Sequence, residues 1–428
     1  MGHIVNPQRE YQLLQKQMDH FITTAPESPI LLEILKMLFT PEEANLARQL
    51  PTCPTPLSKL SKKLKMEPQA LEDKLSELAL RGLVVDVKKG QERFFALAPV
   101  LGGIFEFIMM RIRDNLPVPQ LAELFDQYIK KNQNFIYASF DTKYPFARAF
   151  VREESLPDEK EVSTEVLDWE RVSKIIETAS NVSVGLCACR HNNQHLGKAC
   201  SNPLETCISI NGGADAMIQM KISKQITTKD AMNIVENCKK HQLVQIGDNV
   251  QQGVTFLCNC CSCCCSLINA IRTCNIKHAI KTSNWVMSVD KEKCKGCGKC
   301  TAVCPVQAIE LKKVKELDNQ PSTADVDDTL CLGCGVCSTV CKSGAINMKP
   351  RPQRVLPPET AFERMVQRAV ERGVLSDLIL ENPEKLSYRA FAYILSVLEK
   401  TSAGKALYSI KPLNSIFFNQ AIKILRSE

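Results

Sequence analysis

Two stretches of the chain, 294-CKGCGKCTAVCP-305 and 331-CLGCGVCSTVC-341, share one cysteine spacing. In each stretch three cysteines are separated by two residues, and a fourth follows after three more. Thiolates are soft ligands that suit iron in a tetrahedral sulfur field. Each stretch also carries two glycines, which let the backbone approach a cluster closely and direct its N–H groups at sulfide. The repeat therefore predicts a pair of iron–sulfur sites.

This spacing matches the cysteine run of bacterial two-cluster ferredoxins, in which the fourth cysteine ligates the other cluster. One [4Fe-4S] cluster is predicted to use Cys294, Cys297, Cys300 and Cys341, and the other Cys331, Cys334, Cys337 and Cys304. Lys342 stands where the first run has Pro305, which affects exposure or potential rather than ligation. A pair of zinc knuckles is the alternative, but zinc sites rarely use such an eight-cysteine repeat.

A second cysteine-rich part precedes the repeat. The stretch 258-CNCCSCCC-265 holds Cys258, Cys260, Cys261, Cys263, Cys264 and Cys265, and 187-CACRHNNQHLGKACSNPLETC-207 holds Cys187, Cys189, Cys200 and Cys207. We interpret the stretch 187–207 as one metal site, in which Arg190 reduces the local negative charge. Neighbouring cysteines rarely bridge each other, and their side chains point apart. The ten cysteines are therefore predicted to build two iron–sulfur clusters; one cluster, or zinc, remains open.

Strands are expected at 181–186 and 253–257, each ending just before a cysteine. If these strands are neighbours, the two cysteine loops meet in space. His191 and His195 are expected to be solvated loop residues rather than ligands. Cys274 is a weaker candidate ligand, and Cys53 and Cys238 are expected to have no metal role.

The N-terminal part has the pattern of a winged helix. Leucines at helical spacing predict two helices within 57–81, and apolar residues flanking 88-KKGQE-92 predict a hairpin. A DNA reader places the second helix in the major groove, but here that helix carries Glu67, Glu72, Asp73 and Glu77. Because acidic residues repel phosphate, docking or dimerisation, including a homodimer, is preferred over DNA binding.

The fold class is therefore α+β with several domains. We expect a winged-helix-like domain at 1–110, connecting helices and a linker at 111–165, and a Cys-rich α/β domain at 166–285. A two-cluster ferredoxin domain follows at 286–349, and a helical region at 350–428. The last helices, with Phe417, Phe418, Ile422 and Leu425, are expected to pack on the domain or a partner, with peripheral membrane contact as the alternative.

The compartment is expected to be the cytoplasm. The chain has 428 residues, 21 cysteines and a formal charge of +7. Disulfide scaffolds are usually short secreted chains, and no apolar leader is seen after Met1. No apolar run approaches the ~18 residues of a membrane span. A nucleotide fingerprint such as GxGxxG after a strand, or a P-loop, is also missing.

Taken in order, the winged-helix start, "CACR…LGKAC…PLETC", "FLCNCCSCCC" and the repeated run resemble a family of prokaryotic 4Fe-4S dicluster proteins, ferredoxin-like and typical of anaerobes. The resemblance implies electron transfer in the cytoplasm. We expect an electron carrier, or a subunit that passes low-potential electrons to or from a partner oxidoreductase. The alternatives are a redox-sensing DNA-binding regulator and an enzyme with a substrate-reducing cluster in the middle domain.

Overall fold

The N-terminal region consists of helices followed by a small antiparallel sheet. The computed structural model describes residues 7–157, 167–312 and 322–375. The helices are α1 (Pro7–Asp19), α2 (Pro29–Leu38), α3 (Pro41–Ala47), α4 (Leu57–Leu64) and α5 (Pro68–Arg81). Strands β1 (Thr55–Pro56), β2 (Val84–Lys89) and β3 (Glu92–Leu97) pair in the order β1-β3-β2. The predicted helix pair and hairpin are present, and their assignment to the winged-helix class stays a prediction.

Three helices connect this region to the centre of the molecule. They are α6 (Phe105–Met109), α7 (Val118–Phe125) and α8 (Gln133–Phe140), with short helical turns η1 (Val100–Ile104), η2 (Asp126–Lys131), η3 (Glu153–Ser155) and η4 (Asp168–Glu170). The same stretch of chain also forms strand β4 (Ala147–Ala149), which pairs with a strand of the central sheet. The segment expected to be a connector therefore contributes to the middle fold.

The central sheet has six strands in the order β4-β8-β9-β6-β5-β7. The strands are β5 (Val182–Leu186), β6 (Glu205–Ile210), β7 (Lys224–Gln225), β8 (Val244–Asp248) and β9 (Phe256–Cys260). Every neighbouring pair is antiparallel, so the expected α/β description of this region is wrong and α+β replaces it. β6 lies between β5 and β9, so the two strands predicted to deliver cysteines are not direct neighbours.

Five helices accompany this sheet: α9 (Val172–Glu177), α10 (Ala188–His195), α11 (Gly212–Gln219), α12 (Thr228–Lys240) and α13 (Ser266–Cys274). Helices α9 and α12 pack on the sheet through Ile176, Val235 and Ile208. Thr227 and Asp230 form a capping box at the start of α12. Two of the helices, α10 and α13, begin directly at cysteines, which places sulfur at their N-termini.

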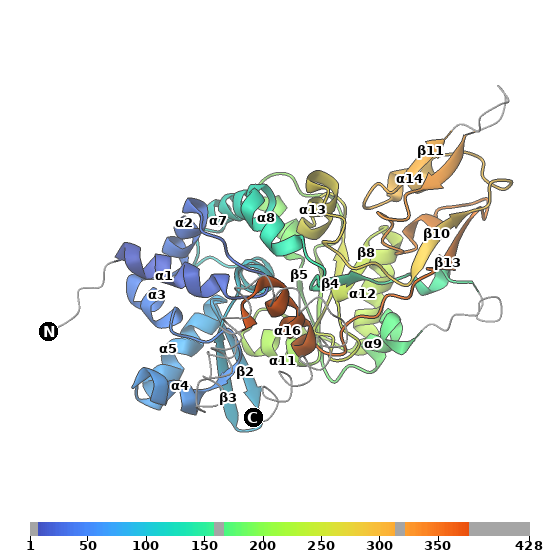
Figure 1. Cartoon of the computed structure of the whole chain (residues 1–428). Coiled ribbons are helices and arrows are strands. Elements are labelled where there is room, and N and C mark those ends of the chain that lie inside the picture. The colour runs from blue at the N-terminus through green and yellow to red at the C-terminus, as the bar shows by residue number, and fades with distance from the viewer. Residues whose placement is uncertain (1–6, 158–166, 313–321, 376–428) are drawn as a thin grey trace, which may run out of the picture.

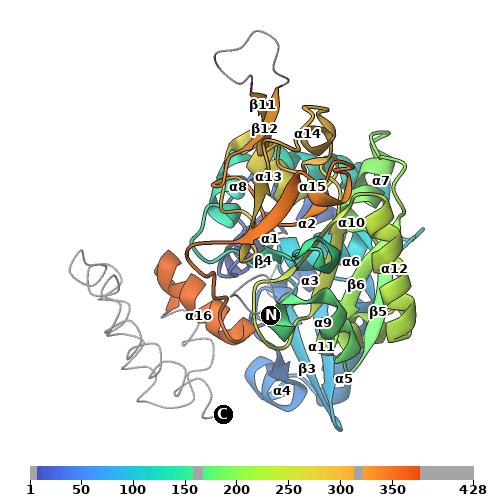
Figure 2. The ribbon, with the colours of Figure 1, turned by 90° about the vertical axis from the view of Figure 1, so that its right-hand side faces the viewer.

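The ferredoxin-like region projects from the end of the central sheet opposite α1–α5 (Figure 1). Strand β10 (Trp285–Val289) pairs with β13 (Ile346–Pro350), and β11 (Ile309–Lys312) pairs with β12 (Thr323–Val326), both antiparallel. The short helices α14 (Lys299–Val303) and α15 (Val336–Thr339) each follow one cysteine loop. Figure 2 shows β11, β12 and α14 at the outer end of this region.

Helix α16 (Ala361–Arg372) contacts parts of the molecule that are distant from it in the sequence. Arg364 forms a buried ion pair with Asp248 of β8, at 3.0 Å. Arg368 donates to the carbonyl of Ala138, and Arg372 donates to that of Asp19. The predictions for the helices after residue 375, including packing through Phe417 and the alternative of membrane contact, concern residues outside the described part of the chain. Within the described residues, no helix combines the length and the apolar character needed to cross a membrane.

Candidate iron–sulfur and metal sites

The eight cysteines of the repeated run line two separate cavities. One is lined by Cys294, Cys297, Cys300 and Cys341, which we call the outer set. The other is lined by Cys304, Cys331, Cys334 and Cys337, which we call the inner set. This is the grouping expected from the spacing, because the fourth cysteine of each run joins the other run. The ligation itself remains a prediction.

Backbone conformation at the glycines shapes these cavities. Gly296, Gly298, Gly333 and Gly335 all have positive φ, between 62° and 76°. A Cβ at Gly333 would lie 2.1 Å from the carbonyl oxygen of Trp285, so no side chain fits there. The amide of Ala308 donates to Cys304 Sγ at 3.2 Å, and that of Ala324 donates to Cys294 Sγ at 3.4 Å. Such N–H···S contacts tune the potential of a bound cluster.

The chemistry of the donors fits metal-bound thiolates. Burial raises the pKa of the Cys334 thiol to about 12, and burial also raises the pKa of Cys304 and Cys337. Such thiols ionise only when a cation replaces the proton, as metal binding does. Cys297 differs from the others because it is exposed at the surface.

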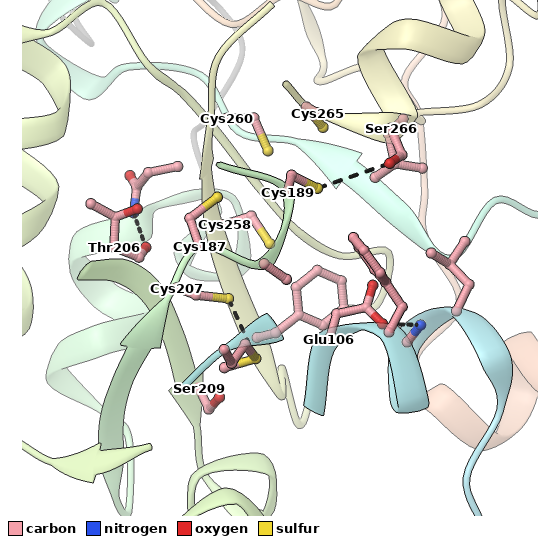
Figure 3. Close-up of a pocket in the computed structure, with 18 of the residues that line it drawn as sticks. Glu106, Cys187, Cys189, Thr206, Cys207, Ser209, Cys258, Cys260, Cys265 and Ser266 are labelled. Carbon is pink, nitrogen blue, oxygen red and sulfur yellow. Dashed lines mark hydrogen bonds between the residues drawn. The ribbon is translucent and has the colours of Figure 1, made fainter. Parts of the chain in front are cut away.

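Seven cysteines of the middle region line one larger cavity of about 230 Å³. Six of them form what we call the cavity set: Cys187, Cys189, Cys207, Cys258, Cys260 and Cys265. The seventh, Cys261, also belongs to a second group described below. Cys258 and Cys260 lie two residues apart on β9 and so share one face of the sheet. Cys207 lies across from Cys258, because Ile208 of β6 pairs with Leu257. Figure 3 shows the six sulfur atoms around a common space.

Helix ends and neighbouring thiols adjust the acidity of this set. Cys187 and Cys265 are the N-cap residues of α10 and α13. Hydrogen bonds from the thiols of Cys189 and Cys260 lower the pKa of Cys265. Burial alone would raise this pKa, but the backbone amides at the start of α13 also lower it. Burial raises the pKa of Cys187 to about 12, although the charge of Arg190 opposes this. The set thus combines thiolate-stabilising groups with a dry environment, as a metal-binding site requires.

Four further cysteines form a much tighter group, the compact set: Cys200, Cys261, Cys263 and Cys264. All four sulfurs lie within 4.8 Å of one another. The sequence suggested one metal site for Cys200 with Cys187, Cys189 and Cys207, whereas the structure places the Cys200 sulfur beside Cys261 and Cys264. Cys200 lies in the loop between α10 and β6, and this loop folds toward the turn after β9. The sequence left the division of the ten cysteines open. The structure brings four of them into the compact set and places the other six around the cavity, with Cys261 of the compact set also on the cavity wall.

Arg190 lies between the two sets and is almost wholly buried. It donates to the carbonyl of Asn259 at 3.1 Å and to the hydroxyl of Thr206. Burial alone would lower its pKa, but the thiols of Cys187, Cys261 and Cys260 raise the pKa above the usual range. Arg190 therefore stays cationic and offsets negative charge from both sets, the role that the sequence suggested.

The two histidines differ: His195 is exposed, as expected, although it lies on α10 rather than in a loop. His191 lies on α10 and is buried, so its prediction as a solvated loop residue is wrong. The Nδ1 atom of His191 lies 2.8 Å from the carbonyl oxygen of Met109. Its Nε2 atom lies 3.3 Å from the Nε2 atom of His195. Cys274 lies on α13 and is in neither sulfur set. Cys238 is fully buried beside Cys261 and Cys264, as an apolar packing residue.

Sequence reasoning missed one acidic residue of the cavity. Glu106 of α6 lines the cavity, and its carboxylate accepts from the amides of Gly102 and Gly103, at 2.8 and 3.0 Å. Burial raises its pKa to about 7, and those amides oppose the rise. The sequence offered only the glycine pair three and four residues before Glu106 as a signal, and this signal is too common to be specific.

The comparisons with known proteins agree with the cysteine spacing. Residues 293–345 match the family model of the 4Fe-4S dicluster domain. This part of the chain is therefore a ferredoxin-like domain of the 4Fe-4S class, whose members serve iron–sulfur electron transfer. The match leaves the N-terminal, middle and C-terminal regions unassigned. Neither the curated proteins nor the solved structures gave a match to this chain.

Proposed function

We propose that this chain is an electron-transfer protein, or an electron-transfer subunit, that passes low-potential electrons to or from a partner oxidoreductase. The observation that carries the proposal is the placement of the two ferredoxin-type cysteine sets. The outer set reaches the surface at Cys297, and the inner set abuts the middle region. Bound [4Fe-4S] clusters supply one-electron chemistry, toward ~−400 mV in familiar ferredoxins.

The contacts of the inner set support a connection to the cavity set. The Arg152 amide donates to the carbonyl of Cys334 at 3.1 Å. The Arg152 guanidinium donates to Thr339 Oγ1 in the ferredoxin-like domain and to the carbonyl of Leu243 in the middle region. Cys260 and Cys265 of the cavity set belong to the same continuous apolar core as Cys334. Arg152 and this core hold the two regions in direct contact.

The charge around the outer set indicates what kind of partner docks there. Lys291, Lys293, Lys295 and Lys299 are all exposed within a few residues of Cys297. Of these, Lys293 is paired with Asp290 at 3.2 Å. A basic surface around an exposed redox site attracts an acidic partner and raises the rate of encounter. We therefore propose a partner with an acidic docking surface.

Small redox probes test this surface without knowledge of the partner. In the reduced protein, Lys295→Glu with Lys299→Glu should slow oxidation by anionic ferricyanide and speed oxidation by cationic hexaammineruthenium(III). The control is Lys229→Glu with Lys240→Glu on α12, which changes the net charge equally at exposed positions outside the ferredoxin-like domain. The effects should shrink with rising salt, since exposed charges are screened. Equal effects of the two double variants would contradict docking at the outer set.

A second candidate is an enzyme that reduces a small substrate in the middle region. The cavity of about 230 Å³ favours it, because Glu106 and several phenylalanines line the space together with the cavity set. Carbon monoxide distinguishes the two candidates, since it binds iron that has an open position. An EPR spectrum of the reduced protein that carbon monoxide leaves unchanged supports the electron carrier, and a changed spectrum supports the enzyme.

We do not propose the DNA-binding regulator. Helix α5 exposes Glu67, Asp73 and Glu77, which would repel phosphate. The hairpin strand β2 packs beside α11 of the middle region, where Asp86 accepts from Gln219. This arrangement favours a structural role for the N-terminal region.

A further inference from the structure

The compact set differs in geometry from the other cysteine groups of this chain. Cys200 Sγ lies 3.8 Å from Cys261 Sγ and 4.0 Å from Cys264 Sγ, and Cys263 Sγ lies 3.7 Å from Cys264 Sγ. Four sulfurs bound to one tetrahedral metal at ~2.3 Å are separated by about 3.8 Å. The observed separations therefore fit four ligands of a single metal ion.

The ferredoxin-like domain provides an internal comparison. In a four-iron cluster each thiolate binds a different iron, so its sulfurs are held further apart than around a single ion. Within residues 7–157, 167–312 and 322–375, one group of three or more potential metal ligands has all its ligand atoms within 4.8 Å of one another, and this group is the compact set. Neither the outer set nor the inner set reaches this spacing. The same holds for the cavity set, which suits a multinuclear cluster instead.

We propose that Cys200, Cys261, Cys263 and Cys264 bind one zinc ion in a closed, structural four-thiolate site. Zinc has no redox chemistry and prefers tetrahedral sulfur ligands in structural sites. With all four positions taken by protein, nothing is left open for a substrate. The zinc site is separate from the electron-transfer proposal and does not depend on it.

The surroundings of the compact set support a structural site. Asn202 Nδ2 lies 3.2 Å from Cys200 Sγ and donates to it. Arg272 of α13 donates to the carbonyl of Ser262, at 3.1 Å, and so fixes the turn that carries three of the ligands. Such outer contacts orient metal ligands. Arg190, next to Cys261, offsets the negative charge that four thiolates leave on a divalent ion.

The role of this zinc follows from where its ligands come from. Cys200 belongs to the loop between α10 and β6, whereas the other three follow β9 directly. Zinc thus joins two loops that are far apart in sequence. The first loop is flanked by Cys189 of α10 and Cys207 of β6, and the second ends at Cys265, the N-cap of α13; all three belong to the cavity set. The ion therefore holds the wall of the cavity in place.

The test uses the full-length protein, purified anaerobically from a medium that supplies both iron and zinc. Elemental analysis should give about one zinc per chain, and zinc K-edge absorption should show four sulfurs at ~2.3 Å. The zinc edge reports on zinc alone, so iron in other sites does not interfere. Zinc below one fifth of the chains, or a mononuclear iron in its place, overturns the proposal.

Matched variants locate the ion. Cys263 is exposed, so Cys263→Ser should leave the fold intact while one of the four sulfurs is replaced by oxygen. Cys264→Ser should lose zinc more than tenfold and keep its iron. The control Cys274→Ser changes a cysteine outside both sets and should keep both metals. If Cys263→Ser or Cys264→Ser loses iron while zinc stays unchanged, the compact set belongs to an iron–sulfur cluster and the proposal is wrong.

Discussion

Two glycines of the outer-set loop should respond very differently to the same substitution. Gly296 and Gly298 both have positive φ, +62° and +73°, a conformation that alanine adopts only with strain. They differ in what a Cβ would meet. At Gly296 the new atom would lie 2.1 Å from the carbonyl oxygen of Ser322, and at Gly298 it would lie 3.6 Å from Leu311 Cδ1. Gly296→Ala should therefore be much more disruptive than Gly298→Ala.

The expected free energies follow from these contacts. The left-handed conformation costs alanine roughly 1–2 kcal/mol at either position. Gly298→Ala adds nothing further, because 3.6 Å is an ordinary contact. Gly296→Ala must also displace a backbone carbonyl by about 1 Å, and overpacking of this kind costs about 1–3 kcal/mol. Ser322 directly precedes β12, whose Ala324 amide donates to Cys294 Sγ, so this displacement also disturbs the outer set.

The assay is iron and acid-labile sulfide per chain, followed by an anaerobic urea titration of the visible cluster absorbance. Gly298→Ala should keep its full iron and lose absorbance at slightly lower urea than the parent protein. Gly296→Ala should lose the iron of the outer set and keep that of the inner set. Equal losses in the two variants, or full iron in Gly296→Ala, would refute the steric argument.

Three further predictions concern buried charges. Burial raises the pKa of Glu106 from 4.5 to about 7. The stability that protonated Glu106 contributes is therefore fully present below pH 4.5 and is lost as the pH rises through about 7. The urea midpoint should therefore fall between pH 5.5 and 7.5 in the parent protein, and Glu106→Gln should flatten this slope; an unchanged slope would assign it to another group. Arg190→Met removes the cation beside the cavity set and should lower the midpoint potential of the middle cluster, measured by EPR-monitored titration, whereas an unaltered potential would show that the charge is offset elsewhere. Arg152→Ala breaks hydrogen bonds between the ferredoxin-like domain and the middle region and should cost about 2–4 kcal/mol of unfolding free energy. An unchanged unfolding free energy in the urea titration would argue against that contact.

The sequence predicted the sites that depend on local spacing. The outer and inner sets follow from cysteines three and four residues apart, and the two helices within 57–81 follow from leucines at helical spacing. In each case neighbours along the chain determine the geometry, so one sequence suffices.

The division of the middle cysteines depended on contacts that the sequence does not contain. Cys207 meets Cys258 because β6 inserts between β5 and β9, and nothing in either strand specifies that order. Cys200 leaves its sequence neighbours because its loop folds toward the turn after β9. The three-residue strand β4 was too short to show a pattern, and it forms only because β8 offers a free edge to it.

The close fit between the ferredoxin-like domain and the middle region has a kinetic consequence. A Cβ at Gly335 would lie 2.2 Å from Ser155 Oγ, so the loop of the inner set is packed directly against the segment that follows Arg152. Because this junction is tightly packed, the fold fixes the distance between the inner set and the cavity set, and no flexible linker sets it. Electron movement within the chain should then be a first-order process, insensitive to solvent viscosity and to protein concentration. Exchange with the proposed partner at Cys297 should instead depend on diffusion and therefore on protein concentration.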